Sequence, residues 1–89
     1  MASIIVSPSE QRRFADYLMD RTKELMQKQR KFTDMINDAR AICQDARYAD
    51  FRKKVEETAL LLEDFSKRAE RYSEFLHQKA RAGERYLKG

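Results

Sequence analysis

The fold is decided by the stretch Ile42-Cys43-Gln44-Asp45-Ala46-Arg47, because two heptad series lose phase across it. The upstream series is apolar every seven residues, at Leu18, Leu25, Phe32 and Ala39, with Ala15, Thr22, Gln29, Ile36 and Cys43 interleaved. The downstream series is Tyr48, Val55, Leu62, Ala69 and Leu76, completed by Phe51, Thr58, Phe65 and Tyr72. The shift between the two series is two residues, whereas coiled coils absorb slips of three or four residues by local winding changes. A chain reversal at this stretch is therefore predicted.

Helix-start residues stand before both series. In Ser7-Pro8-Ser9-Glu10, Ser7 can accept a bond from the Glu10 N–H, the Glu10 carboxylate can reach back, and Pro8 suits the first helical position. Asp45 is the predicted cap of the second helix. The prediction is an all-α chain, an antiparallel two-helix hairpin in one domain of residues 1–89. Its expected parts are a leader 1–6, helix one 8–41, a turn 42–47, helix two 48–82 and a basic tail 83–89.

The composition fits long solvated helices. The 89 residues are 38% charged and include only two glycines and one proline. No run reaches the ~20 apolar residues that span a bilayer, and residues 1–6 lack the basic start of a signal peptide. We therefore expect a chain without a membrane span that is cytoplasmic as synthesised, and any export would use a signal-peptide-independent secretion system.

Helix two carries more apolar surface than one partner helix requires. Leu61, Phe75 and Ala82 lie on one flank at multiples of seven residues, and Leu60 adds to the other side. A stripe that is simply wide is one interpretation. An exposed apolar patch on a small monomer lowers solubility, however, so a second interface is the preferred one. The predicted assembly is a four-helix bundle formed by a homodimer or with a homologous helical partner.

No catalytic constellation is visible. His77 is the only histidine and Cys43 the only cysteine, and a hairpin would place them near opposite ends. We therefore expect no enzyme activity, no cofactor, no metal and no small-molecule substrate. The net charge of +4 would allow contacts with phosphates. Acidic residues interrupt the basic clusters throughout, however, so nucleic-acid binding is the weaker prediction.

The pattern as a whole resembles the Trp-x-Gly family of early-secreted-antigen-like proteins. The residues that carry the resemblance are the opening Ile4-x-Val6-Ser7-Pro8-x-Glu10, the break near position 43 and the aromatic-rich start of helix two. The family's Trp-x-Gly turn would fall on Cys43-Gln44-Asp45, where Trp and Gly are absent, and its following Phe on Phe51. The resemblance implies a non-enzymatic, dimerising hairpin associated with type VII secretion. A chaperone or adaptor subunit of a hetero-oligomeric secretion complex is the alternative.

Overall fold

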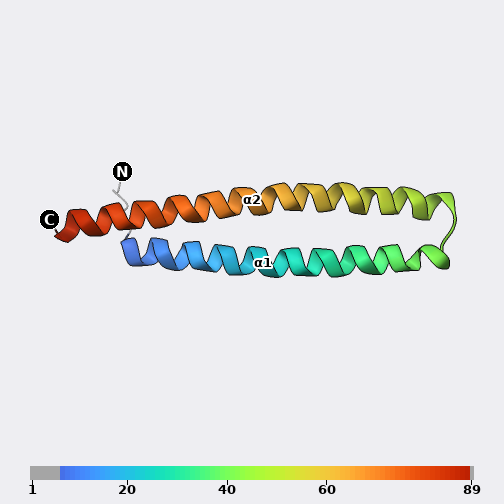
Figure 1. Ribbon diagram of the computed structural model, residues 1–89, viewed down its shortest axis with the longest axis horizontal. Coiled ribbons are helices and arrows are strands. Elements are labelled where there is room, and N and C mark those ends of the chain that lie inside the picture. The colour runs from blue at the N-terminus through green and yellow to red at the C-terminus, as the bar shows by residue number, and fades with distance from the viewer. Residues whose placement is uncertain (1–6, 89) are drawn as a thin grey trace, which may run out of the picture.

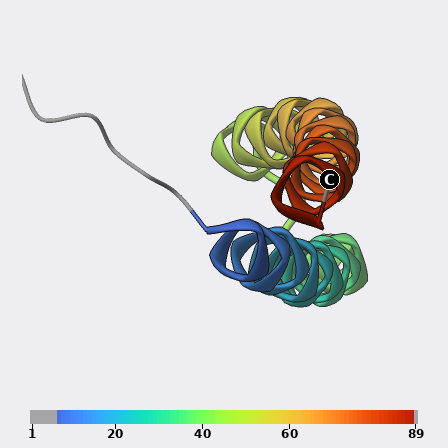
Figure 2. The same ribbon diagram turned by 90° about the vertical axis from the view of Figure 1, so that its left-hand side faces the viewer.

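The computed structural model describes residues 7–88, with side chains placed through residue 86, so the predicted leader 1–6 lies outside the described residues. Helix α1 (Pro8–Asp38) ends in a short 3-10 helix, η1 (Ala39–Ala41), and α2 (Ala46–Lys88) returns antiparallel along it (Figure 1). Viewed down the long axis, the two helices are inclined to each other and wind around one another (Figure 2). The predicted all-α hairpin is confirmed.

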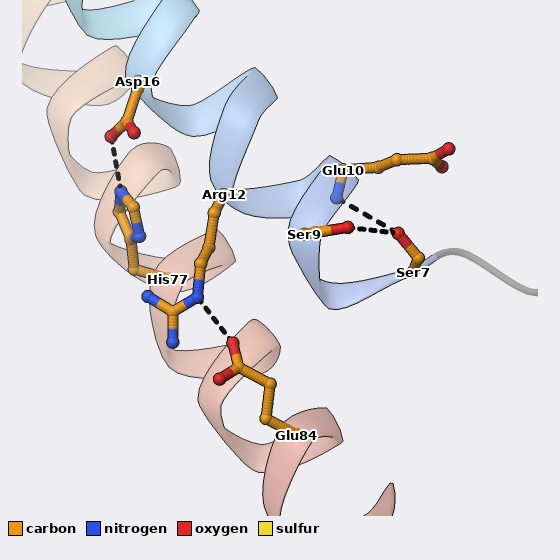
Figure 3. Close-up of polar contacts among 7 residues, drawn as sticks. All are labelled: Ser7, Ser9, Glu10, Arg12, Asp16, His77 and Glu84. Atoms are coloured by element: carbon orange, nitrogen blue, oxygen red, sulfur yellow. Dashed lines mark hydrogen bonds and ion pairs between the residues drawn. The ribbon is translucent and has the colours of Figure 1, made fainter.

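The N-terminus of α1 is capped by Ser7. The Ser7 backbone is extended, and its hydroxyl accepts the Glu10 N–H at 3.2 Å, with Pro8 at the first helical position. The reciprocal half of the predicted capping box is absent, because the Glu10 carboxylate points away (Figure 3). The Ser7 hydroxyl instead lies 3.0 Å from the Ser9 hydroxyl. The first turn of α1 is therefore held by one side-chain cap and by the fixed φ of proline.

Asp45 caps α2 as predicted. Its carboxylate accepts the Tyr48 N–H at 2.8 Å, so the helix begins at Ala46, two residues before the expected position 48. The Tyr48 hydroxyl donates to the Ile36 carbonyl and ties the two helices together beside the turn. Along the described backbone no residue adopts a positive φ. The reversal therefore needs no turn of the kind that requires a positive φ. This explains why it contains no glycine.

The far end of α2 differs from the prediction. The helix continues through Gly83 to Lys88, so residues 83–88 of the expected tail are helical. A glycine inside a helix costs about 1 kcal/mol relative to alanine, but here the helices are close together. A Cβ at Gly83 would lie 3.2 Å from Cγ of Pro8. This glycine marks a close approach of α1 and α2 and does not end the helix.

Most of the residues in the packing seam between the helices are small. Ala15 and Ala80 are fully buried, and the Ser73 hydroxyl donates to the Ala15 carbonyl at 3.1 Å across the seam. Small side chains let two helices approach closely, since the packing distance depends on the residues at the contact. Among residues 7–86, the buried side chains are five apolar and two polar: Ala15, Thr22, Val55, Ala69, Ser73, Leu76 and Ala80.

The seam corrects part of the predicted stripe. Val55, Ala69 and Leu76 are buried as expected, but Leu25 is 40% exposed and Leu62 is only partly buried. The aromatic row of α2 that was expected to complete the stripe is half-exposed, and it consists of Phe51, Phe65 and Tyr72. The row of α2 that faces α1 is instead the one that includes Ser73 and Ala80. The large side chains are thereby left on one flank of the hairpin.

Candidate protein interaction face

One side of the hairpin carries large apolar side chains along its length. On each helix they occupy the two heptad rows beside the packing seam, and each keeps between 40% and 71% of its surface exposed. Hollows between the helices bring the two sets together: Leu25 and Phe32 share a groove with Phe51, and Phe14 shares one with Tyr72. We call this set the apolar face, and its members are Phe14, Leu25, Phe32, Met35, Phe51, Leu61, Phe65, Tyr72 and Phe75.

The apolar face is hollowed in its half nearer the turn. A groove of about 460 Å³ runs between Leu25 and Phe32 of α1 and Phe51 and Thr58 of α2. Near the open end of the hairpin, the Tyr72 and Phe75 rings stack with centroids 6.1 Å apart. Ridges of side chains on one helix pack into grooves on another. A furrow bordered by large side chains at heptad spacing therefore has the form of a helix-packing surface.

The opposite side of the hairpin is polar and holds the helices in register. Nε of Arg12 on α1 donates to the Glu84 carboxylate on α2 at 2.5 Å, and Nε2 of His77 lies 3.1 Å from a carboxylate oxygen of Asp16 (Figure 3). All four side chains are partly exposed. Because exposed pairs of this kind contribute at most about 1 kcal/mol each, their main effect is to favour one alignment of the two helices.

The four residues predicted for the interface lie on two different sides. Leu61 and Phe75 belong to the apolar face, and Ala82 continues their heptad row. Leu60 lies on the other side, where it lines a hollow with Met26 and is 67% exposed. A residue next in sequence to Leu61 on a helix points about 100° away from it, so Leu60 and Leu61 cannot serve one flat surface.

The predicted turn residues are also divided. Cys43, Gln44 and Asp45 lie in the connection between η1 and α2, where the Gln44 side-chain amide donates to the Ala41 carbonyl at 3.4 Å. Phe51 lies in α2 and is 50% exposed on the apolar face. Cys43 is a half-buried free thiol. Asp45 thus has a structural role at the turn, whereas Phe51 belongs to the candidate site.

Most of the apolar face was assigned by the sequence to the contact within the hairpin. Phe32 and Phe65 have the spacing of core residues, and their size makes them the obvious choice. A second pattern in the sequence indicates the row that actually faces α1. It is a row of small residues on α2, Ala59, Ser66, Ser73 and Ala80. A helix with a small row beside a large row can use the small one for its nearest neighbour. The large row then remains for another partner.

The cysteine and the histidine lie in different parts of the hairpin. Cys43 is in the turn, whereas His77 lies opposite Asp16 near the open end of the hairpin. Residues 7–88 contain no group of three His, Cys, Asp or Glu placed to hold a metal ion. Neither helix, over the part of the chain described, is long and apolar enough to cross a membrane. The chain matches no family model, and no curated protein or solved structure is significantly similar to it.

Proposed function

We propose that this protein is a non-enzymatic interaction module whose apolar face packs against two further helices and completes a four-helix bundle. The observation that supports the proposal is the series of half-exposed large side chains on one side of both helices. Large exposed apolar patches mark interaction sites on small proteins. Heptad spacing on both helices fits helical partners, since helix bundles pack through such rows.

The energetics of this face favour association without fixing the partner. Fully burying a large apolar side chain contributes ~1.5–3 kcal/mol, so covering the exposed halves of the apolar face contributes on the order of 10 kcal/mol. Association costs about 4–15 kcal/mol in lost translational and rotational freedom. The two terms are of the same size. Contacts at the edges of the face therefore decide both the affinity and the identity of the partner.

The biological setting of the proposal comes from the family resemblance. A hairpin related to Trp-x-Gly proteins would act in a secretion complex, either as a self-associating subunit or as a chaperone or adaptor for another subunit. This second part of the proposal rests on the pattern around Ser7-Pro8 and Phe51. Genes for secretion ATPases or secreted toxins beside the gene for this chain would support it.

The apolar contacts of the interaction face can be tested apart from its charges by measuring self-association in high salt. In about 1 M NaCl the Debye length is ~3 Å, so repulsion between copies is screened and the apolar face should self-associate at high concentration. Sedimentation equilibrium should detect this association. Phe51→Ser and Phe65→Ser should each weaken it about tenfold or more, the effect of ~1.4 kcal/mol.

Leu60→Ser is the matched control. Leu60 is 67% exposed and lies on the polar side of the hairpin, so its replacement should leave the association unchanged. A native chain that stays monomeric at several hundred micromolar in high salt would contradict the proposal. So would a Leu60→Ser variant that dissociates as readily as the two phenylalanine variants.

A further inference from the structure

The charged residues in the rows of the apolar face all have the same sign. These rows run in steps of seven from 11 to 39 and from 14 to 35 on α1, and from 51 to 79 and from 47 to 82 on α2. They contain no Asp or Glu. They contain six cationic residues, which are Arg21, Lys28, Arg47, Lys54, Arg68 and Lys79.

These cations border the apolar grooves directly. Lys28 and Lys54 line the groove beside Phe51 from the two helices. Lys79 lines the hollow beside Phe14 and Tyr72, together with Glu10. A helix laid along the apolar face would therefore have a cationic side chain on either side of it. In helical bundles the residues that flank the apolar rows form interhelical ion pairs, and these pairs choose the partner.

The ion pairs that the free hairpin makes at this edge are weak. Arg21 pairs with Glu24 at 3.1 Å, and Arg68 pairs with Asp64 at 2.9 Å, in both cases between well-exposed side chains. Exposed pairs of this type contribute little to stability, because solvent screens them. Arg21 also lies 5.1 Å from the centre of the Tyr17 ring, and Tyr17 and Glu24 raise the pKa of its guanidinium. Arg21 thus stays charged, and the side chains in these weak pairs can turn toward a partner at little cost.

A second copy is a poor match for this edge. A symmetric dimer uses the same patch twice, so it would bring the cationic rows of one copy against those of the other. Like charges at facing positions destabilise a helix pair, whereas opposite charges stabilise it. Resting on the proposed function, we infer that the natural occupant of the apolar face is a helical protein segment, different from this chain, whose flanking rows carry Asp and Glu.

The pattern beyond the cations favours a helix over a flat anionic surface. The next heptad row outward on each helix is rich in carboxylates, among them Glu10, Glu24, Glu57 and Asp64. A membrane or nucleic acid covering the face would also meet these acids. Glu10 also lines the hollow beside Phe14 and Tyr72, whereas no carboxylate lines the groove between Lys28 and Lys54. One helix of the partner, about 10–12 Å wide, can therefore lie in that groove between the cations without meeting the outer acidic rows.

The probe for this inference is a charge-inverted copy of the chain itself. The face-inverted variant carries Lys28→Glu, Lys54→Glu, Arg68→Glu and Lys79→Glu. Each reversal subtracts two charges, which takes the net charge from +4 to −4. The matched control inverts four exposed cations on the opposite side, one on α1 and three on α2 as before: Arg13→Glu, Lys53→Glu, Lys67→Glu and Arg81→Glu.

The expected result is a preference for the mixed pair. At low ionic strength, sedimentation equilibrium should show the native chain binding the face-inverted variant about tenfold or more tightly than it binds itself, since ion pairs replace like-charge contacts. The preference should fade in about 1 M NaCl. The control variant has the same net charge and should show no comparable preference. Circular dichroism verifies folding, and Lys28→Glu with Lys79→Glu is a milder probe if the fourfold variant unfolds.

Three outcomes would overturn the inference. Self-association of the native chain as tight as the mixed pair would assign the face to a second copy. An equal gain with the control variant would reduce the effect to net charge. If the control variant bound phosphatidylglycerol vesicles as the native chain does and the face-inverted variant did not, the face would be assigned to a membrane. A failure of every mixture to associate in high salt would instead contradict the proposed function.

Discussion

Gly83 lies against the ring of Pro8, so that a Cβ added to Gly83 would come within 3.2 Å of Cγ of Pro8. Gly83→Ala has two opposing effects. It gains about 1 kcal/mol of helix propensity, and it presses on a ring in the first turn of α1, which can shift by a few tenths of an ångström. We expect a small net increase, about 0.5 kcal/mol, in the free energy of unfolding measured in urea.

A larger side chain at this position should reverse the sign. Gly83→Leu must displace the start of α1, and overpacking of this kind costs ~1–3 kcal/mol. A loss with alanine as large as the loss with leucine would show that the ring of Pro8 is held rigidly in place.

The buried hydroxyl of Ser73 should contribute measurably to stability. Ser73→Ala removes the hydrogen bond to the Ala15 carbonyl, and the expected loss is ~0.5–1.5 kcal/mol in the free energy of unfolding. Ser66→Ala is the control, because Ser66 lies one heptad earlier in the same row and is only partly buried. Its effect should stay within about 0.5 kcal/mol. Equal losses from the two variants would contradict a specific role for the Ser73–Ala15 bond.

The cap at the start of α2 gives a third prediction. Asp45→Ala leaves the Tyr48 N–H without its side-chain acceptor and should cost ~0.5–2 kcal/mol of stability. Asp45→Asn keeps an acceptor and should retain most of it. Asp50→Ala, an exposed position inside the helix, should change stability by less than about 0.5 kcal/mol. Thermal unfolding of the three variants would test the order.

Substitutions in the seam and on the apolar face should differ in their effect on the stability of the dilute hairpin. Leu76 is 7% exposed, so Leu76→Ala should cost ~2–5 kcal/mol. Leu61 is 71% exposed, so Leu61→Ala should cost less than about 0.5 kcal/mol in the dilute hairpin. The same Leu61→Ala variant should weaken the high-salt association. Equal losses of monomer stability would show that the buried side has been misplaced.

The sequence predicted the elements of this fold well because their causes are local. The loss of heptad phase between Cys43 and Tyr48 predicted the reversal, and short polar side chains at Ser7 and Asp45 predicted the caps that are observed. Each of these depends on residues within one or two helical turns. Such contacts can be worked out before the helices are placed against each other.

The choice of packing row could not be predicted in the same way. Phe65 and Ser66 stand on opposite sides of the Leu62 row, and either could face α1. A large buried area favours the Phe65 row at the contact with α1, whereas a close approach of the helices favours the Ser66 row. Which row faces α1 depends on how the two helices pack together. The His77–Asp16 contact and the Gly83–Pro8 contact depend on the same register. These two contacts follow from the register of the packed helices, which the spacing of residues does not fix.

The elongated form of the hairpin affects how its size will be judged in solution. It measures 66 × 26 × 16 Å with a radius of gyration of 19.8 Å, whereas a compact chain of this length has about 12 Å. A rod of this shape has more friction than a sphere of equal mass, so a single copy should leave a gel-filtration column earlier than its mass predicts. An early elution would therefore report shape as much as assembly.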